Sequence, residues 1–491
     1  MASHMTADEF RRHGHQLVDW VADYWSGLAQ RRVSPDLAPG AIASLLPARA
    51  PDKGEGFDAI VADLDTVVTP GLTHWQHPNF YAYFPANTSG PSVLADLVTA
   101  GLGVQGMMWA TSPACTELET VMLDWLADLL GLPERFRSSS TGGGVIQDSA
   151  SSATLVATLA ALHRASGGRW RAEGIDRRYT VYTSTHGHSS IEKAVRLAGL
   201  GDHGLRLIDV DTGGSQALDP AALRRALVAD REAGATPALV VATIGTTSTT
   251  AIDPLPEIAA ICQEFGIWLH VDAAYAGAAA VCPELRWTHA GLEFADSYCF
   301  DPHKWLLTGF DCDAFWVADR AELIQALSVL PEFLRNAATE SGAVIDYRDW
   351  QVPLGRRMRA LKLWFVLRWY GADGLREHIR SGVSMAQEFA SWVRADVRFE
   401  IVAPHPFSLI CFRLRDEVAG PGRTEAEADA ANEELLRRIN ASGSSYLSHT
   451  KVDGRFTLRL AIGSPQTTLA HVTDTWHQIQ SAAKSLAQSP R

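Results

Sequence analysis

The sequence predicts an α/β protein with a mostly parallel, doubly wound β-sheet. From about residue 140 to residue 305, short apolar stretches rich in β-branched residues alternate with segments of helical periodicity. The clearest strands are expected at residues 179–184, 238–243 and 267–271. Ligands of such open sheets bind in the crevice outside the carboxyl ends of the strands, so we expect the functional residues there.

The segments that precede the sheet are predicted to be mainly helical, with helices at residues 93–102 and 114–130. Thr6 and Glu9 have the spacing of a capping box, and a helix with many large apolar side chains follows them. That apolar face has to be buried, and a partner subunit would bury it. Residues 69–92 place many aromatic side chains between prolines, which excludes a regular helix or a central strand. This block forms either one wall of a pocket or a packed hydrophobic turn.

The pattern changes after about residue 375, where a smaller α+β unit is predicted. Its strands are expected near residues 399–402, 409–414 and 457–461, with helices between and after them. We therefore expect three parts, which are a helical N-terminal arm and dimerisation segment at 6–85, a large α/β domain at 86–372 and a small α+β domain at 373–485.

Composition and charge exclude several classes of protein. The 491 residues are 46% apolar and 20% charged, as in globular proteins, and carry a net charge of −13 without a run of Lys or Arg. We therefore expect no nucleic-acid partner. No apolar run approaches the ~18 residues that a membrane span needs, so no membrane partner is expected either. The six cysteines are scattered and form no CxxC pair, which indicates reduced thiols in a cytoplasmic protein and no metal site.

The stretch from residue 267 to residue 305 carries the strongest chemical signal. Two probable strands end here, one on Asp272 and one on Asp301-Pro302-His303-Lys304. A carboxylate and an amine at neighbouring strand ends are what pyridoxal phosphate (PLP) requires, since the Lys forms a Schiff base and the Asp keeps the pyridine nitrogen protonated. Taken alone, the stretch is equally compatible with an ordinary buried strand and a surface lysine.

Two further features fit a phosphorylated, planar cofactor. Residues 141–152, TGGGVIQDSASS, lead into a predicted helix at 153–164, and glycines and hydroxyls at a helix start suit a phosphate. The spacing matches neither a P-loop nor GxGxxG, which makes ATP and dinucleotides poor candidates. His188 follows a predicted strand, and Ser189 is expected to cap the next helix. His188 either stacks on a planar cofactor or is a hydrogen-bonded loop residue.

Together these motifs resemble the fold-type I, PLP-dependent group II amino-acid decarboxylases, and more narrowly the aromatic-L-amino-acid decarboxylases. The resemblance covers about residues 10 to 480. It implies an aspartate-aminotransferase-like fold, a PLP cofactor, an aromatic L-amino acid of the Trp, Phe, Tyr or dopa class as substrate, and a homodimer with shared active sites. The segments that carry it are HPNFYAYFP, SPACTELE, GGGVIQDSAS, GHSSIEKA, ATIGTTSTTAIDPL, WLHVDAAYAG, DPHKWLL, FDCDAFWV and IDYRDWQVPLGRR.

The resemblance also implies roles for the matching positions. Lys304 would bind the cofactor covalently, Asp272 would pair with the pyridinium nitrogen, and His188 would stack on the ring. The other expected cofactor contacts are Ala274 on the opposite ring face, Thr247 near the ring oxygen, and Ala150, Ser151, Asp301 and His303 around the phosphate. The expected substrate contacts are Trp75, Tyr83, Phe84 and Gly355, with Gln105 and Met107 supplied by the partner subunit.

Two departures from the family pattern bear on function. Asp301 stands where many relatives have Asn, and a carboxylate near a phosphate is unfavourable unless it is turned away or protonated. Phe333, in a stretch at 331–347 with no clear periodicity, stands where the decarboxylases usually carry a Tyr that is thought to protonate the carbanion left by CO2. Phenylalanine has no proton to give. Relatives with Phe here can react with O2 and release an aldehyde, ammonia and hydrogen peroxide.

The sequence thus predicts an aromatic-amino-acid decarboxylase that yields an arylalkylamine, with an aromatic aldehyde synthase as the alternative. Another fold-type I enzyme, an aminotransferase or a desulfurase, is a third possibility, against which the aromatic block and the lack of a matching catalytic Cys count. A protein that binds without catalysis is a fourth, disfavoured because Lys304, Asp272 and His188 are all present.

Overall fold

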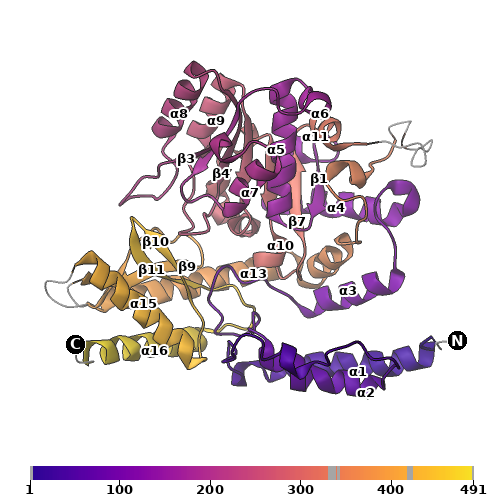
Figure 1. Ribbon diagram of the computed structural model, residues 1–491, viewed down its shortest axis with the longest axis vertical. Helices are drawn as coiled ribbons and strands as arrows, with labels where there is room; N and C mark the ends of the chain where they lie inside the picture. Colours follow the sequence, from indigo (N-terminus) through magenta and orange to yellow (C-terminus); the bar gives the residue numbers. More distant parts are fainter. Residues whose placement is uncertain (1–3, 330–338, 340–342, 417–423, 489–491) are drawn as a thin grey trace.

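A seven-stranded mixed β-sheet forms the centre of the protein, as seen in the computed structural model, which describes residues 4–329, 339, 343–416 and 424–488 (Figure 1). The strand order is β1-β7-β6-β5-β4-β2-β3, and β7 alone runs antiparallel to its two neighbours. The predicted fold class is therefore confirmed. The strands are β1 (Gly143–Gln147), β2 (Tyr179–Ser184), β3 (Leu205–Ile208), β4 (Thr236–Thr243), β5 (Trp268–Asp272), β6 (Ser297–Phe300) and β7 (Asp313–Val317).

The register of the central strands brings their carboxyl ends to one edge. Thr243 of β4 lies beside Asp272 of β5, and Asp272 lies beside Cys299 of β6. All five residues of β5 are buried, which is why this strand reads as one apolar run. The sequence therefore placed Asp272 and the residues after β6 correctly at a shared edge.

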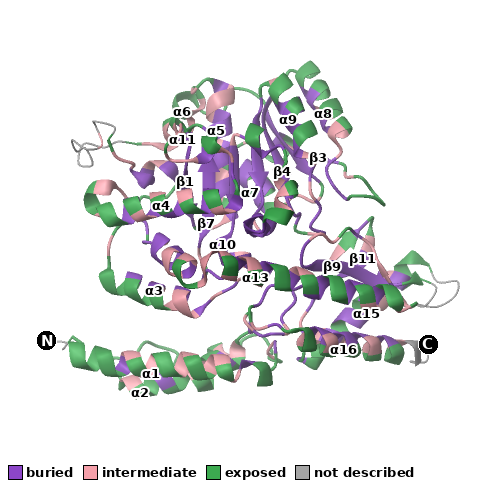
Figure 2. Ribbon diagram, turned by 180° about the vertical axis from the view of Figure 1, so that it is seen from behind, coloured by how far each residue is buried: buried purple, intermediate pink, exposed green. Residues whose placement is uncertain are grey.

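Helices cover both faces of the sheet and enclose a core on each side (Figure 2). On one face, α5 (Ala150–Ser166), α7 (Ser189–Leu197) and α11 (Arg320–Leu327) pack on alternate residues of the strands. The other face is covered by α4 (Pro113–Leu130), α8 (Pro220–Glu232) and α9 (Leu255–Phe265). Because α5 follows β1 directly, its N-terminus is at the same edge of the sheet as Asp272.

The long helix α13 (Ala360–Ala395) leads from the large sheet to a smaller one. Gly371 interrupts it with a φ of 61°, a left-handed value that glycine adopts without strain. The second sheet is antiparallel, in the order β10-β11-β9-β8, and α15 (Glu425–Ser442) and α16 (Leu469–Gln488) pack on it. Its strands are β8 (Phe399–Ile401), β9 (Leu409–Leu414), β10 (Ser448–Val452) and β11 (Arg455–Ala461). The boundaries at 6–85, 86–372 and 373–485 stay a prediction.

The N-terminal helices lie away from the large sheet (Figure 1). Helix α1 (Ala7–Ser26) begins with the predicted capping box of Thr6 and Glu9. His13 is its one buried residue, and the view from behind shows α1 and α2 (Phe57–Asp63) largely exposed (Figure 2). Among the helices that the structure describes, including α3 (Gly90–Leu102), none is long and apolar enough to cross a membrane.

Candidate active site

Lys304 and the buried Asp301 form an ion pair at the end of β6. Both follow the strand directly, Asp301 as N-cap and Lys304 inside the short helix α10 (Pro302–Trp305). The Lys304 Nζ atom lies 2.8 Å from Asp301 Oδ2. Burial alone would lower the pKa of Lys304, but the carboxylates of Asp301 and Asp272 raise it above its usual value. The amine is thus held as an ammonium beside Asp301.

Asp272 ends β5 and is almost completely buried. Its Oδ1 atom accepts a hydrogen bond of 2.9 Å from the backbone N–H of Ala274. This bond fixes the carboxyl group and leaves Oδ2 for a ligand. The fixed carboxylate suits a protonated ring nitrogen.

His188 lies across the cavity from the strand ends. It is the N-cap of α7, and its Nδ1 atom accepts a 3.2 Å hydrogen bond from Ser190 N–H, with Ser190 Oγ at 2.8 Å. The prediction that Ser189 caps this helix is therefore wrong, because the imidazole takes that place. Burial lowers the pKa of His188. The ring is thus neutral, and its Nε2 carries the proton that faces the cavity.

The N-terminus of α5 offers a place for an anion. Its N-cap residue, Ser149, makes no side-chain capping bond, so no serine hydroxyl covers the start of this 17-residue helix. One of them, Ala150 N–H, donates to Asp301 Oδ1 at 3.2 Å. His303 Nδ1 lies 2.8 Å from the Cys312 carbonyl oxygen, and burial lowers the pKa of the imidazole. A phosphate here would meet backbone donors and the helix dipole.

These groups line one cavity of about 240 Å³. Its lining includes the amine of Lys304, the fixed carboxylate of Asp272 and the N-terminus of α5. That set of donors and acceptors matches the aldehyde, ring nitrogen and phosphate of PLP, so the residues present fit this cofactor. All nine predicted cofactor contacts line it: Ala150, Ser151, His188, Thr247, Asp272, Ala274, Asp301, His303 and Lys304.

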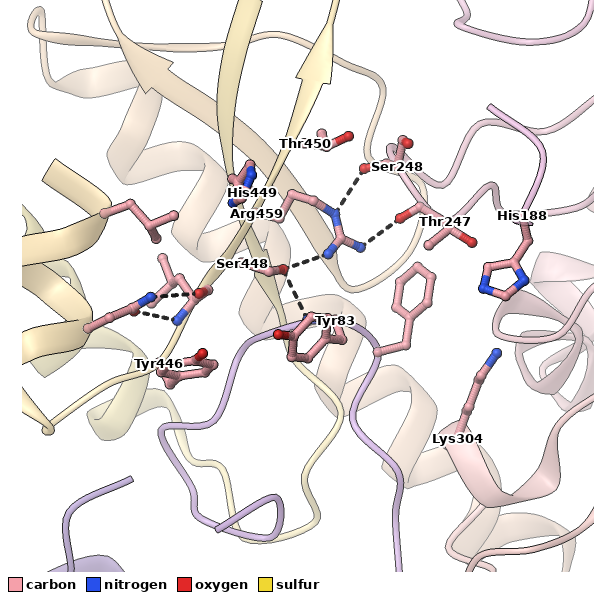
Figure 3. A pocket seen from close by; sticks show the side chains of 14 residues that line it. Tyr83, His188, Thr247, Ser248, Lys304, Tyr446, Ser448, His449, Thr450 and Arg459 are labelled. Atoms are coloured by element: carbon pink, nitrogen blue, oxygen red, sulfur yellow. Dashed lines mark hydrogen bonds between the residues drawn. The ribbon is translucent and has the colours of Figure 1, made fainter. Parts of the chain in front are cut away.

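A second cavity of about 470 Å³ opens from the first towards the C-terminal sheet (Figure 3). Phe84, His188, Thr247 and Lys304 line both cavities. The ring of Phe84 is stacked on Tyr275 with 3.8 Å between centroids. The outer cavity thus starts at the amine and is walled by aromatic side chains.

Arg459 of β11 is a residue of this outer cavity that sequence reasoning missed. It is buried and donates to the carbonyl oxygens of Thr247 and Ser248 and to Ser448 Oγ, at 2.8, 3.0 and 2.7 Å (Figure 3). Its guanidinium also lies 5.2 Å from the centre of the Phe84 ring. The sequence does carry a signal, which is an arginine within the apolar run of residues 456–461. Arginine is seldom buried without a partner, so its place in such a run indicates a buried polar contact.

The predicted substrate residues divide into two groups. Tyr83 and Phe84 line the outer cavity, and Trp75 supports it by stacking on Tyr83 at 5.6 Å. Gln105, Met107 and Gly355 line neither cavity in the described part of the chain. Gln105 Oε1 instead accepts from Arg356 N–H at 2.9 Å, beside Gly355, and the Met107 carbonyl accepts from Arg348 N–H. Phe333 lies outside the described residues.

A lysine, an aspartate and a helix N-terminus around one cavity, on this mixed sheet, define a fold-type I PLP-dependent enzyme. Residues 39–415 match the family model described as "Pyridoxal-dependent decarboxylase conserved domain". The chain belongs to this family, and to its aromatic-amino-acid branch, and its cofactor is pyridoxal 5′-phosphate. The predicted enzyme class and cofactor are therefore confirmed.

Three relatives show how similar the chain is to that branch. It is 46% identical to aromatic-L-amino-acid decarboxylase of Bos taurus over 494 residues, covering 99% of this chain and 98% of that protein. It is 45% identical to phenylacetaldehyde synthase of Arabidopsis thaliana over 487 residues, covering 98% and 97%. A crystal structure of Oryza sativa TDC with PLP and tryptamine superposes with a TM-score of 0.96 at 42% identity, covering 99% of each chain. Decarboxylases and an aldehyde synthase are thus similar to this chain to the same degree.

Proposed function

We propose that this chain removes CO2 from an aromatic L-amino acid of the Trp, Phe, Tyr or dopa class at Lys304. The observation that carries the proposal is the assembly of Lys304, Asp272 and His188 around one cavity that continues into an aromatic-walled one. Relatives named for tryptophan, tyrosine and aromatic L-amino acids support the substrate class.

Bound pyridoxal phosphate supplies an electron-poor ring that accepts the electron pair left when the bond between Cα and the carboxyl group breaks. Lys304 provides the amine that holds the cofactor. Asp272 keeps a proton on the ring nitrogen, since its Oδ1 is fixed by Ala274 N–H and its Oδ2 is free to accept. His188 presents a neutral ring with Nε2–H towards the cavity, and the N-terminus of α5, at Ala150 and Ser151, would hold the phosphate.

The aromatic side chain of the substrate would lie against Tyr83 and Phe84. Tyr83 is held by Trp75, and Phe84 lies between Tyr275 and the guanidinium of Arg459. A pocket wall braced in this way orients the substrate, and orientation decides which Cα bond breaks.

The active site is completed by a second copy of the chain. Gln105, Met107 and Gly355 lie together away from the cavities of their own chain, as expected for residues that serve a partner. Apolar side chains of the N-terminal helices are exposed, among them Phe10 and Val18 of α1 and Leu94, Leu97, Val98 and Leu102 of α3. Such a surface is typical of a dimer interface.

The product depends on how the carbanion is quenched. In the decarboxylases that the chain resembles, a Tyr at the position of Phe333 supplies the proton that yields an amine, and a phenyl ring has no proton to supply. Phe333 therefore favours the aldehyde synthase outcome, in which the amino acid, O2 and water give the aldehyde, CO2, ammonia and hydrogen peroxide. The amine is the alternative, which the similarity to decarboxylases supports.

Product analysis tests both outcomes. Purified holoenzyme is given each of the four amino acids in air, and amine, aldehyde and peroxide are measured. Equal amounts of aldehyde and peroxide support the synthase, whereas amine without peroxide excludes it. The variant Phe333→Tyr is expected to raise the share of amine by about 10²-fold or more, because it restores a proton donor. An unchanged product ratio in this variant would show that residue 333 does not control the product.

A further inference from the structure

Two carboxyl groups lie side by side beneath the proposed phosphate position. Phe300 of β6 pairs with Ala314 of β7, so the next residues in each direction, Asp301 and Asp313, are neighbours across the two strands. Asp301 is 2% exposed and Asp313 is fully buried. The two carboxyl groups therefore adjoin each other in the protein interior. Two buried carboxylates side by side repel each other unless one of them carries a proton.

The contacts show which of the two carboxyl groups carries it. Asp301 accepts from Lys304 Nζ at 2.8 Å and from Ala150 N–H at 3.2 Å, so its oxygens are well supplied with donors. Among the described residues, no N–H or O–H group donates to either oxygen of Asp313. Gln147, which faces Asp313 from β1, gives its amide N–H to the Trp350 carbonyl instead. Among the described residues, no hydrogen-bond donor therefore stabilises Asp313 as an anion.

The charged groups around the pair lead to the same assignment. Asp313 faces Asp301 at the start of α10, Lys304 within α10 and Asp272 on β5. His303 and the Cys299 thiol, which also adjoin the pair, are held neutral, because burial lowers the pKa of the first and raises that of the second. Burial and the two nearby aspartates raise the pKa of Asp313 well above its usual value. Burial alone would raise the pKa of Asp301 too, but the Lys304 ammonium lowers it.

We propose that Asp313 is a positioning residue, which stays protonated at neutral pH and donates its proton to Asp301, so that Asp301 can lie beside the cofactor phosphate. The proposal rests on the phosphate being bound at the N-terminus of α5. It explains how this chain tolerates a carboxylate there. When Lys304 holds the cofactor, its ammonium no longer neutralises Asp301. The proton on Asp313 is then the hydrogen bond that Asp301 still accepts from β7.

A pH dependence of cofactor binding follows. When rising pH removes the shared proton, the pair holds two negative charges beside a phosphate, and the cofactor is repelled. Above the pKa of the pair, the dissociation constant of PLP should rise by up to about tenfold for each pH unit.

The test is a titration of cofactor-free protein with PLP from about pH 6 to pH 9, followed by its visible absorbance. Wild type is expected to bind more weakly at alkaline pH. Asp313→Asn keeps a neutral donor of the same shape and is expected to lose this weakening. Asp301→Asn is the matched control that removes one charge from the same pair, and it should lose the weakening as well. The ionisation of PLP itself affects all three proteins equally, so it cancels in the comparison.

Infrared spectroscopy of the cofactor-free protein gives a second readout. Wild type should show the carbonyl band of a protonated, buried carboxyl group at neutral pH, and Asp313→Asn should lack it. If the band persists in Asp313→Asn, or if this variant follows the wild-type pH profile, the proposal is overturned. Asp313→Ser serves as a second variant should Asp313→Asn fold poorly, which thermal unfolding detects. Neither readout uses a substrate. Failure of this proposal therefore leaves PLP binding by the wild type intact, whereas failure of the wild type to bind PLP would refute the proposed function.

Discussion

The inner and outer cavities differ in how their walls are assembled. The inner cavity is made mainly by strand ends and helix starts around one sheet, namely β5, β6, α5 and α10, and it holds the ion pair of Asp301 and Lys304. The outer cavity combines the N-terminal arm, the loop after β4 and the C-terminal sheet. The inner cavity, which fits the cofactor, is thus built around one sheet, whereas the outer cavity joins parts of the chain that are far apart in sequence.

This difference has a physical reason. Parallel strands in register bring their ends together without any further contact, so the cofactor groups are fixed by the sheet itself. The outer wall depends on side chains that reach between units, such as Arg459 from β11 to the loop at Thr247. We therefore expect changes in the inner cavity to abolish chemistry and changes in the outer cavity to alter substrate use.

The largest effect is expected for Lys304→Ala. Without the amine the cofactor has no covalent anchor, and activity should fall by several orders of magnitude. The visible absorbance of the Lys-bound cofactor should be lost from the purified variant. As a control, Lys193→Ala removes a lysine of α7 that lines neither cavity and should leave the spectrum unchanged. Retention of the band in Lys304→Ala would assign the anchor to another lysine.

Asp272→Asn should have the next largest effect. The amide cannot keep the ring nitrogen protonated, so the electron pair from Cα is accepted less readily, and kcat should fall by on the order of 10²-fold. Cofactor binding should weaken less, because the contacts of Lys304 and α5 remain. Stopped-flow absorbance separates the two effects. A raised KM with an unchanged kcat would show that Asp272 contributes to binding and not to the chemical step.

Co-expression of two inactive variants tests the shared site. Lys304→Ala lacks the amine, and Gly355→Arg places a bulky cation where the partner's substrate would bind; Gly355 is exposed, so the fold should survive. If the sites are shared, a mixed dimer holds one site with both wild-type parts, and about a quarter of wild-type activity should return. The two variants expressed separately and assayed without subunit exchange are the control. No recovery would place Gly355 outside the partner's active site.

How far the sequence predicted the molecule also differs between the two cavities. Asp272 and Lys304 end apolar strands, and period and composition locate such ends well. The start of α7 was placed one residue late, because His188 caps the helix with an imidazole rather than Ser189 with a hydroxyl. Propensity ranks serine above histidine at this position and says nothing about the cavity that holds the ring.

Strands β1 and β10 and the pairing of Asp301 with Asp313 were not predicted, and all three depend on contacts between strands. Strand β1 is rich in glycine and β10 is largely polar and partly exposed, so neither shows the alternation or apolar run of a strand. Each is a strand because a neighbour, β7 or β11, supplies its hydrogen bonds. The pairing of Asp301 with Asp313 likewise depends on register between strands, which a single sequence does not reveal.

The smallest effect is expected for Arg459→Lys, and it separates the two cavities most sharply. An ammonium cannot reproduce three directed hydrogen bonds and a position over the Phe84 ring, so the loop at Thr247 and the aromatic wall should loosen. The value of kcat/KM should fall about tenfold, mainly through KM, while the absorbance of the bound cofactor persists. Arg455→Lys on the same strand is the control, since its guanidinium pairs with Glu400 away from the cavity. Loss of the cofactor band in Arg459→Lys alone would mean that the outer wall also holds the inner cavity together.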